Sequence, residues 1–270
     1  MSRMQSRLAF LPLVTVVLLG GSAKAHDLYL VTGIAGAEGK VCARIGEKFP
    51  ESTGAVTADR LEFFQLRAGG GITPLKGAKQ DDQFCASLPP DSAGVAEIVV
   101  HPRFIKLSAE DFNSYIEGEK FSDVYRLRRT TGKTNAEGRE LYSRYGKLLM
   151  GALGERATKP VGHILEIIPE KDPAELKPGE PLRVRVLFRG KPLPGAHVGA
   201  VYSGAVLTGH DFPVLAETGQ NGWALLKFDR PGLWYARLIH MTPAQGDPEI
   251  DWRSYFATLT FSLDKPSAAR

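Results

Sequence analysis

Residues Leu182–Phe188 read LRVRVLF, and this stretch decides the fold class. Apolar side chains at every second position alternate with two arginines, which is the pattern of a β-strand with one face in water. Residues 254–263, SYFATLTFSL, show the same period of two near the end of the chain. Turn-forming pairs such as Arg189-Gly190 and Asn221-Gly222 lie between such segments. About seven strands in roughly 100 residues predict an immunoglobulin-like or prealbumin-like sandwich.

A second β-rich region precedes this one, over residues 26–107. Short segments of strand-like composition, among them KVCARIGE at 40–47 and DQFCASL at 82–88, are separated by clusters of Gly, Pro, Asp and Ser. Such spacing favours an antiparallel sandwich or barrel. The expected fold class is therefore mainly β, with two sandwich regions.

The hydrophobic period changes between the two β regions, over residues 108–160. Ser108 and Asp111 resemble a capping box, and apolar residues follow at helical spacing. A second helical stretch is expected at 123–129. A third is expected from about Ala136, with one face formed by Leu141, Tyr145, Leu148, Leu149 and Ala152. The predicted organisation is a signal peptide (1–25), a β domain (26–107), a helical insertion (108–160), a C-terminal β-sandwich (161–264) and a tail (265–270).

The predicted third helix carries polar side chains as well. Glu137 and Glu140 are interpreted as part of its solvated face. The most distinctive polar cluster of the chain follows and consists of Tyr142, Arg144, Tyr145 and Lys147. We interpret this cluster as a structural one that docks the helical insertion onto a sandwich.

The first 25 residues have the composition of an export signal. Arg3 and Arg7 precede an apolar run of about fourteen residues, and Ala23-Lys24-Ala25 supplies the small residues that a signal peptidase accepts. The run is shorter than an ordinary transmembrane helix, although a retained membrane anchor is the alternative. We expect a periplasmic or secreted protein that begins at His26 and has no stable membrane span after cleavage.

The net charge excludes one class of partner. The chain has 34 basic and 30 acidic residues, but the first 25 residues hold three of the basic ones and no acid. Their removal leaves 31 basic residues against 30 acidic ones. A nearly neutral chain without a basic cluster gains little counterion-release energy on a polyanion, so no nucleic-acid partner is expected.

Cys42 and Cys85 are the two cysteines of the chain, and each lies in a strand-like segment. In an oxidising compartment two such thiols favour a disulfide over a metal site. Closing a loop of roughly 44 residues stabilises a fold by about 4 kcal/mol in the chain-entropy model. The alternative is two separately buried thiols.

Five segments, in their order along the chain, carry a resemblance to a known family. They are AHDLYL, RELYSRYGKLL, GHILEIIP, LFRGKPLPGAHVGA, and GLWYARLIH with SYFATLTF. In this order they resemble the periplasmic domain-of-unknown-function family once labelled the nickel-uptake substrate-specific region. The resemblance implies an accessory role in the uptake or handling of nickel or cobalt, with an envelope metal transporter as partner.

Cleavage after Ala25 would make His26 a chelating residue. Its free α-amine and its ring Nδ1 would then hold one metal ion, and a nitrogen of a second histidine would complete a histidine brace. Such nitrogen sites prefer Cu(II) and bind Ni(II) less tightly. The alternative is that His26 is only a polar residue at a frayed terminus.

Three further histidines are candidates for the second metal ligand. His240 ends the strand-like segment LWYARLIH, although a hydrogen-bonded core histidine fits that position equally well. His163 precedes LEIIP, and His101 stands before Pro102 at a strand end. His197 and His210 are interpreted as surface residues. The spacing of these histidines matches no compact metal motif.

These features lead to one expected function and two alternatives. We expect a metal-binding protein that is not an enzyme, since no nucleophile, phosphate-loop or dinucleotide motif occurs in the sequence. A protein- or glycan-interaction module without metal is the first alternative. A copper oxygenase that uses the brace is the second.

Overall fold

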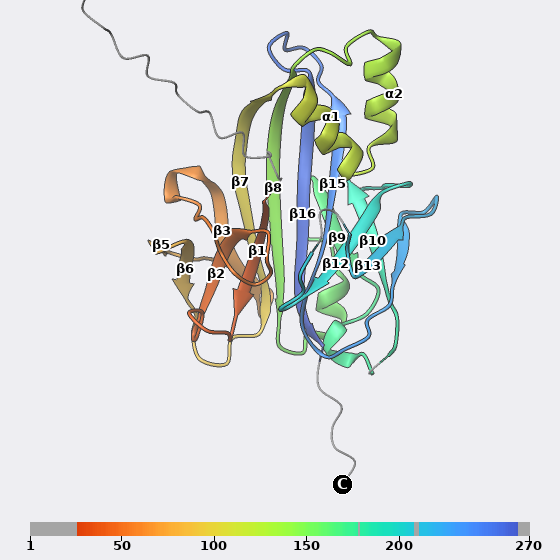
Figure 1. Ribbon diagram of the computed structural model, residues 1–270. Coiled ribbons are helices and arrows are strands. Elements are labelled where there is room, and N and C mark those ends of the chain that lie inside the picture. The colour runs from red at the N-terminus through yellow and green to blue at the C-terminus, as the bar shows by residue number, and fades with distance from the viewer. Residues whose placement is uncertain (1–25, 178, 208–210, 264–270) are drawn as a thin grey trace, which may run out of the picture.

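The computed structural model describes residues 26–177, 179–207 and 211–263, and a long eight-stranded sheet forms its frame (Figure 1). In spatial order its strands are β13 (Val214–Glu217), β12 (His197–Tyr202), β15 (Gly232–Pro243), β16 (Trp252–Leu263), β8 (Gly138–Met150), β7 (Gly94–Leu107), β3 (Leu61–Ala68) and β4 (Gly71–Pro74). Neighbouring strands are antiparallel, except that β16 and β8 run parallel. This parallel pair joins a strand from the middle of the chain, β8, to the last strand, β16.

A small sheet covers one face of β8, β7 and β3. Its strands, in order, are β1 (Asp27–Thr32), β2 (Lys40–Gly46), β6 (Gln83–Ser87) and β5 (Gly77–Gln80). Alternate residues of both sheets form the core between them, which includes Leu28, Leu30, Val41, Ala43, Phe64, Leu66, Phe84, Ala96, Ile98, Leu148 and Met150. The first β region of the sequence is therefore a sandwich.

Cys42 and Cys85 form a disulfide between β2 and β6. The two residues are direct partners in the antiparallel register of these strands, 43 positions apart in the sequence. Both cysteines are buried. The predicted disulfide is confirmed.

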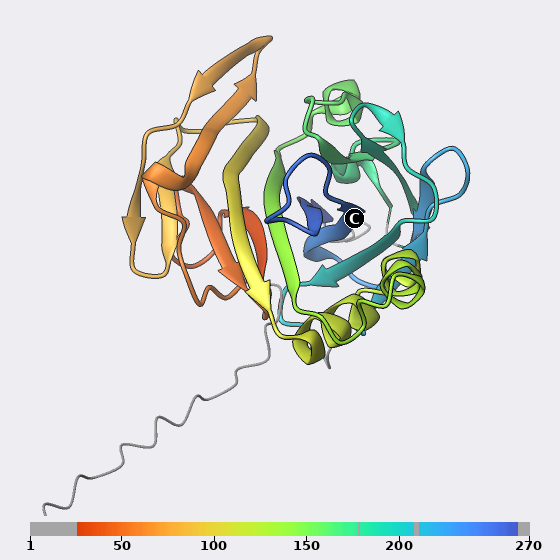
Figure 2. The same cartoon turned by 90° about the horizontal axis from the view of Figure 1, so that it is seen from above.

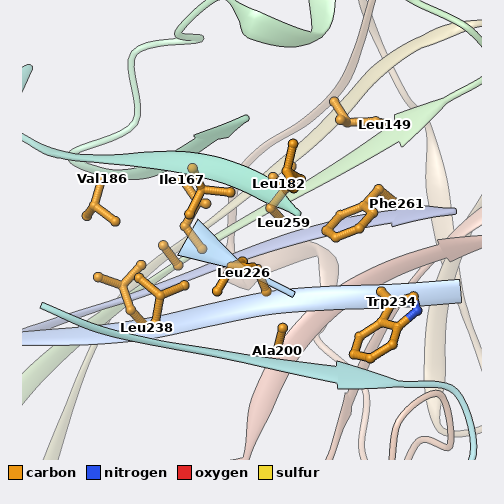
Figure 3. Close-up of a cluster of buried hydrophobic side chains, with 14 of the residues drawn as sticks. Leu149, Ile167, Leu182, Val186, Ala200, Leu226, Trp234, Leu238, Leu259 and Phe261 are labelled. Atoms are coloured by element: carbon orange, nitrogen blue, oxygen red, sulfur yellow. The ribbon is translucent and has the colours of Figure 1, made fainter. Parts of the chain in front are cut away.

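A second small sheet covers the opposite face of the long sheet. It comprises β9 (Leu165–Pro169), β10 (Leu182–Phe188), β14 (Trp223–Leu226) and the short β11 (Lys191–Pro192). Strand β10 buries Leu182, Val184 and Val186 and exposes Arg183, as its alternating sequence predicts. Figure 3 shows Leu182 and Val186 of β10 on one side of the core, which also contains Trp234, Leu259 and Phe261 of the long sheet.

The two sandwiches share β7 and β8, which lie between them (Figure 2). On β7, Ala96 and Ile98 belong to the first core, whereas Val95 and Val99 belong to the second. The mainly β, sandwich-like class expected from the sequence is confirmed. Strands β7 and β8 therefore contribute side chains to the cores of both sandwiches.

Two short helices, α1 (Ala109–Gly118) and α2 (Ser122–Thr130), follow β7 (Figure 1). Ser108 Oγ accepts the backbone N–H of Asp111 at 3.0 Å, so the predicted N-terminal cap of α1 is present. The helices bury Phe112, Ile116 and Val124 against the ends of β15 and β16. Three short 3₁₀ helices complete the described elements: Ala58–Arg60, Gly154–Thr158 and Pro173–Glu175.

The predicted third helix is wrong, because residues 138–150 form the central strand β8. Neighbouring sheets bury both faces of this strand, so Leu148, Leu149 and Met150 are apolar in succession and period two disappears. A strand buried on both faces is hard to distinguish from a buried helix by periodicity alone. The helices of the predicted insertion are α1, α2 and the short 3₁₀ helix Gly154–Thr158.

Three predictions concern residues beyond the part of the chain that the structure describes: the signal peptide at 1–25, the tail at 265–270, and the surface position of His210. Within the described part, no helix combines the length and the apolar character needed to cross a membrane.

Candidate functional site

A cavity of about 310 Å³ lies where β7, β8 and β16 extend beyond the first small sheet, beside α1. We call it the terminal cavity because His26, the predicted first residue of the processed chain, lies in its wall. The residues that line it are His26, Ile45, Arg103, Ile105, Leu107, Tyr115, Glu140, Tyr142, Arg144 and Phe256.

Strand register explains why these side chains converge. Tyr142 and Arg144 lie on the face of β8 that buries Leu148 lower down. A β-bulge between Val100 and Arg103 adds one residue to β7, and this keeps Arg103 on the same face as its partner Tyr142. On the other side of β8, Phe256 is the register partner of Arg144. The floor of the cavity is therefore three strands wide.

Glu140 is the acidic group of the cavity, and its side chain is nearly inaccessible to water. Ser254 Oγ donates a hydrogen bond to Glu140 Oε1, and the Tyr115 hydroxyl lies 3.5 Å from the same oxygen. Burial raises the pKa of Glu140 to about 7, although these two hydroxyls and Arg144 act in the opposite direction. A carboxyl with this pKa exchanges its proton near neutral pH.

Arg144 is half-buried between two aromatic rings. Its guanidinium carbon lies 4.9 Å from the ring centroid of Tyr142 and 5.7 Å from that of Phe256. Its Nε is buried and has no hydrogen-bond partner among the described residues. Burial lowers the pKa of Arg144, and the nearby Arg103 lowers it further. The Arg144 guanidinium is therefore positioned by the faces of two rings, and its Nε has no hydrogen-bond acceptor among the described residues.

A buried ion network fixes the chain just after His26. Arg237 Nε lies 3.2 Å from the Asp27 carboxylate, and Arg237 Nη1 donates to Glu119 Oε2 at 2.6 Å. The Tyr235 hydroxyl donates to Asp27 at 2.9 Å. Asp27 begins β1 and Glu119 caps the end of α1. The network therefore holds the start of β1, and with it His26, next to the helix that lines the cavity.

The His26 side chain contacts a carboxylate. Its Nε2 lies 3.1 Å from Glu47 Oε1, and both side chains are about two-fifths exposed. Glu47 follows the last residue of β2. A neutral imidazole that donates from Nε2 keeps its lone pair on Nδ1. In that tautomer Nδ1 is the acceptor nitrogen of the ring.

The other candidate histidines lie in different surroundings. His240 lines a second cavity, of about 390 Å³, together with His197 and Glu217. Its ring meets Phe188 edge to face at 4.6 Å, and burial, with a smaller effect of Arg189, lowers its pKa to about 4. His101 is exposed in the β-bulge of β7. Neither His240 nor His101 lines the terminal cavity.

His163 belongs to a group of charges on and beside β3, β7, β8 and β9, which we call the Lys147 cluster and which is buried except for Arg67. Lys147 Nζ lies 2.7 Å from Glu166 Oε1, and Arg67 Nε lies 2.8 Å from Glu97 Oε1. His163 Nε2 lies 3.6 Å from the second oxygen of Glu97. The cluster comprises Arg67, Glu97, Lys147, His163 and Glu166.

The structure brings none of the other predicted ligands into the terminal cavity with His26. The described residues contain no group of three or more His, Cys, Asp or Glu side chains that could hold a metal ion. A chelate formed by the α-amine and the ring of one residue needs no such group. The sequence analysis overlooked the cavity because it placed Glu140 and Arg144 on a helix. Polar or aromatic residues at 140, 142 and 144 were the available signal.

Comparison with known proteins adds the family. No curated protein matches the chain. The family model described as domain of unknown function DUF4198 matches residues 23–242, which is well over half of the sequence. The match spans β1 to the end region of β15 and includes every residue that lines the terminal cavity except Phe256. The chain belongs to this domain-of-unknown-function family.

Proposed function

We propose that this protein is exported, is cut after Ala25, and binds a divalent transition metal with the new terminus at His26. In this proposal it is an accessory to metal uptake or handling, and an envelope metal transporter receives the ion. The contact between His26 Nε2 and Glu47 carries the proposal. The family resemblance to a nickel-uptake region supports it.

The contact suits metal binding because it uses the nitrogen that the chelate does not need. Metal-ligating histidines usually donate their second ring N–H to a carboxylate or carbonyl, which fixes the tautomer and the ring orientation. Glu47 is in that position, and the buried network of Asp27 holds the adjacent backbone. The α-amine and Nδ1 of His26 would then form a chelate on a prepared support.

The charges around the cavity favour a position of the proposed ion at the rim over one in the interior. Arg103 and Arg144 line the interior and would repel a cation there, whereas Glu47 supplies negative charge outside. A two-donor chelate leaves coordination positions open for ligand exchange. This suits the transfer of an ion to a partner, so we propose binding without a chemical step. Nitrogen donors favour Cu(II) over Ni(II) and Ni(II) over Co(II).

The test compares proteins that differ only at the terminus and its support. Protein with a verified His26 start is titrated with Cu(II), Ni(II) and Co(II) against a chromophoric chelator. One added residue before His26 converts the amine into an amide, and we expect it to abolish the tight site. Glu47→Gln should weaken binding by about ten- to a hundredfold.

A second histidine–glutamate pair provides the matched control. His197 Nε2 lies 3.9 Å from Glu217 Oε2, and His197 is about one-third exposed. His197→Ala and Glu217→Gln should leave the metal affinity unchanged. Equal affinity in the extended protein would overturn the proposal and favour an interaction module without metal.

A further inference from the structure

We propose that the terminal cavity binds a small organic acid, whose carboxylate pairs with Arg144 and whose apolar body lies against the surrounding aromatic and aliphatic walls. The site is separate from the metal chelate, which uses atoms of His26 at the rim. The proposal does not depend on metal binding.

The hydrogen-bonding capacity of Arg144 is the first argument. The guanidinium carbon of Arg144 lies 4.9 and 5.7 Å from the ring centroids of Tyr142 and Phe256. These contacts use the face of the guanidinium, so its N–H groups can still donate hydrogen bonds to an acceptor. The Nε hydrogen has no acceptor among the described residues, although the atom is buried. A buried donor without a partner is unfavourable. A carboxylate is the group that matches the planar edge of a guanidinium.

The charge of the cavity is the second argument. Arg103 lies close enough to Arg144 to lower its pKa, so two like charges face one space. Glu140 is the acidic side chain in the lining. Its pKa of about 7 means that below neutral pH it is mostly uncharged. Asp27, which also acts on Arg144, is already bound to Arg237 and Tyr235. A bound anion would balance the charge.

The apolar walls of the cavity indicate the chemistry of the part of the ligand that is not the carboxylate. Ile45, Ile105, Leu107 and Phe256 line the cavity, and its volume of about 310 Å³ is at the lower end of the range for small-molecule pockets. An inorganic anion would leave these walls in water. A carboxylate attached to a phenyl ring or a branched chain satisfies both the guanidinium and the walls.

Another arginine of the chain provides a matched control. Arg185 is half-buried, its guanidinium carbon lies 5.7 Å from the ring centroid of Trp223, and its Nε also lacks a partner among the described residues. It is on β10 and is not part of the terminal cavity. Arg185→Gln therefore removes the same kind of side chain without touching the proposed site.

The experiment is calorimetric titration of the processed protein, shown to be metal-free by elemental analysis, in a buffer without carboxylates. The probes are benzoate, 3-phenylpropanoate, the neutral amide of 3-phenylpropanoate, and inorganic phosphate. We expect both acids to bind, and we expect the affinity of the amide to be lower than that of 3-phenylpropanoate by about tenfold or more. Phosphate should bind more weakly than the acids because it cannot cover the apolar walls.

The variants locate the site. Arg144→Gln should weaken binding of 3-phenylpropanoate by about ten- to a hundredfold, and Arg185→Gln should leave it unchanged. Ile105→Trp fills the cavity while keeping both arginines, and it should abolish binding even if Arg144→Gln fails to fold. Absence of binding by both acids, equal affinity for acid and amide, or full affinity in folded Arg144→Gln or Ile105→Trp protein would overturn the proposal. A failed metal site would change none of these results.

Discussion

The terminal cavity and the Lys147 cluster use opposite faces of the same two strands. In the cluster, Lys147 and Glu97 each meet an opposite charge, at 2.7 and 2.8 Å, and the backbone N–H groups of Val161 and Gly162 also donate to Glu166. In the cavity, Glu140 meets hydroxyl groups, and the Nε of Arg144 meets no acceptor among the described residues. The first arrangement is a closed set of ion pairs, although His163 Nε2, 3.6 Å from Glu97, forms no hydrogen bond among the described residues. The second arrangement lines a cavity and has room for a ligand.

The difference has a physical consequence. A closed set of buried charges stabilises the fold only as a unit, because loss of one member leaves the others buried without a partner. A set that is completed by a ligand contributes less to folding and more to binding. Mutations on the two faces of β7 and β8 should therefore affect different properties.

The largest effect is expected for Lys147→Met. The substitution keeps the length of the side chain but leaves Glu166 buried without its cation, so we expect the free energy of unfolding to fall by about 3–5 kcal/mol. Urea denaturation followed by circular dichroism measures it. Arg144→Gln, which removes stacking on two rings, should cost about 1 kcal/mol. Equal losses in the two variants would contradict the comparison.

The next effect is the pH dependence that Glu140 confers. Its pKa in the folded protein, about 7, exceeds the ordinary value of 4.5, so the folded state holds its proton more tightly. Wild-type stability from this group is complete below pH 4.5 and is lost as the pH rises through 7. Glu140→Gln, which cannot ionise, should gain about 3 kcal/mol relative to wild type between pH 4.5 and pH 8.5.

Urea denaturation across that pH range measures the gain. Glu137→Gln is the control, because Glu137 is an exposed carboxyl on the same segment and pairs with Lys106 at 2.7 Å. The stability of the Glu137→Gln variant should follow that of the wild type at each pH. A Glu140→Gln variant with the pH profile of the wild type would show that the cavity does not hold a protonated carboxyl.

A smaller effect is expected for Ser254→Ala. The hydroxyl stabilises the carboxylate form of Glu140, so its removal should raise the pKa of Glu140 above 7. Loss of this one hydrogen bond should lower stability by about 1 kcal/mol. Nuclear magnetic resonance titration of the Glu140 carboxyl carbon measures the pKa. An unchanged or lower value would contradict the hydrogen-bonding role.

The smallest effect concerns the second cavity. His240 has a pKa of about 4, mainly because of burial, and should remain neutral from pH 5 to pH 8. Arg189→Gln removes the lesser cause and should raise the pKa slightly, to a value still below 6.5. The nuclear magnetic resonance shifts of the carbon-bound ring protons of His240 measure its pKa in the wild type and in Arg189→Gln. Protonation near pH 6.5 in the wild type would mean that the His240 ring is solvated like that of a surface histidine.

The sequence predicted the elements whose pattern is local. Alternation in Leu182–Phe188, the Ser108 cap and the cysteine pair each rest on neighbouring residues or on simple chemistry, and the structure confirms all three. Strand β8 was misassigned because burial on both faces removes the alternation that identifies a strand.

The terminal cavity could not be predicted because it forms between strands that are distant along the chain. It depends on the register of β7, β8 and β16, and on a bulge that keeps Arg103 beside Tyr142. His26 was predicted from its place after a predicted signal sequence, but its partner Glu47 is set by the pairing of β1 with β2. Long-range pairing of this kind leaves no local pattern in a single sequence.

The most direct test of the proposed function is anomalous diffraction from crystals of the processed protein loaded with Cu(II). The account predicts one copper peak bonded to the α-amine and Nδ1 of His26, with Glu47 on Nε2 and no peak inside the cavity beside Arg144. A principal peak at His240 or His163, or no ordered copper at His26, would contradict it.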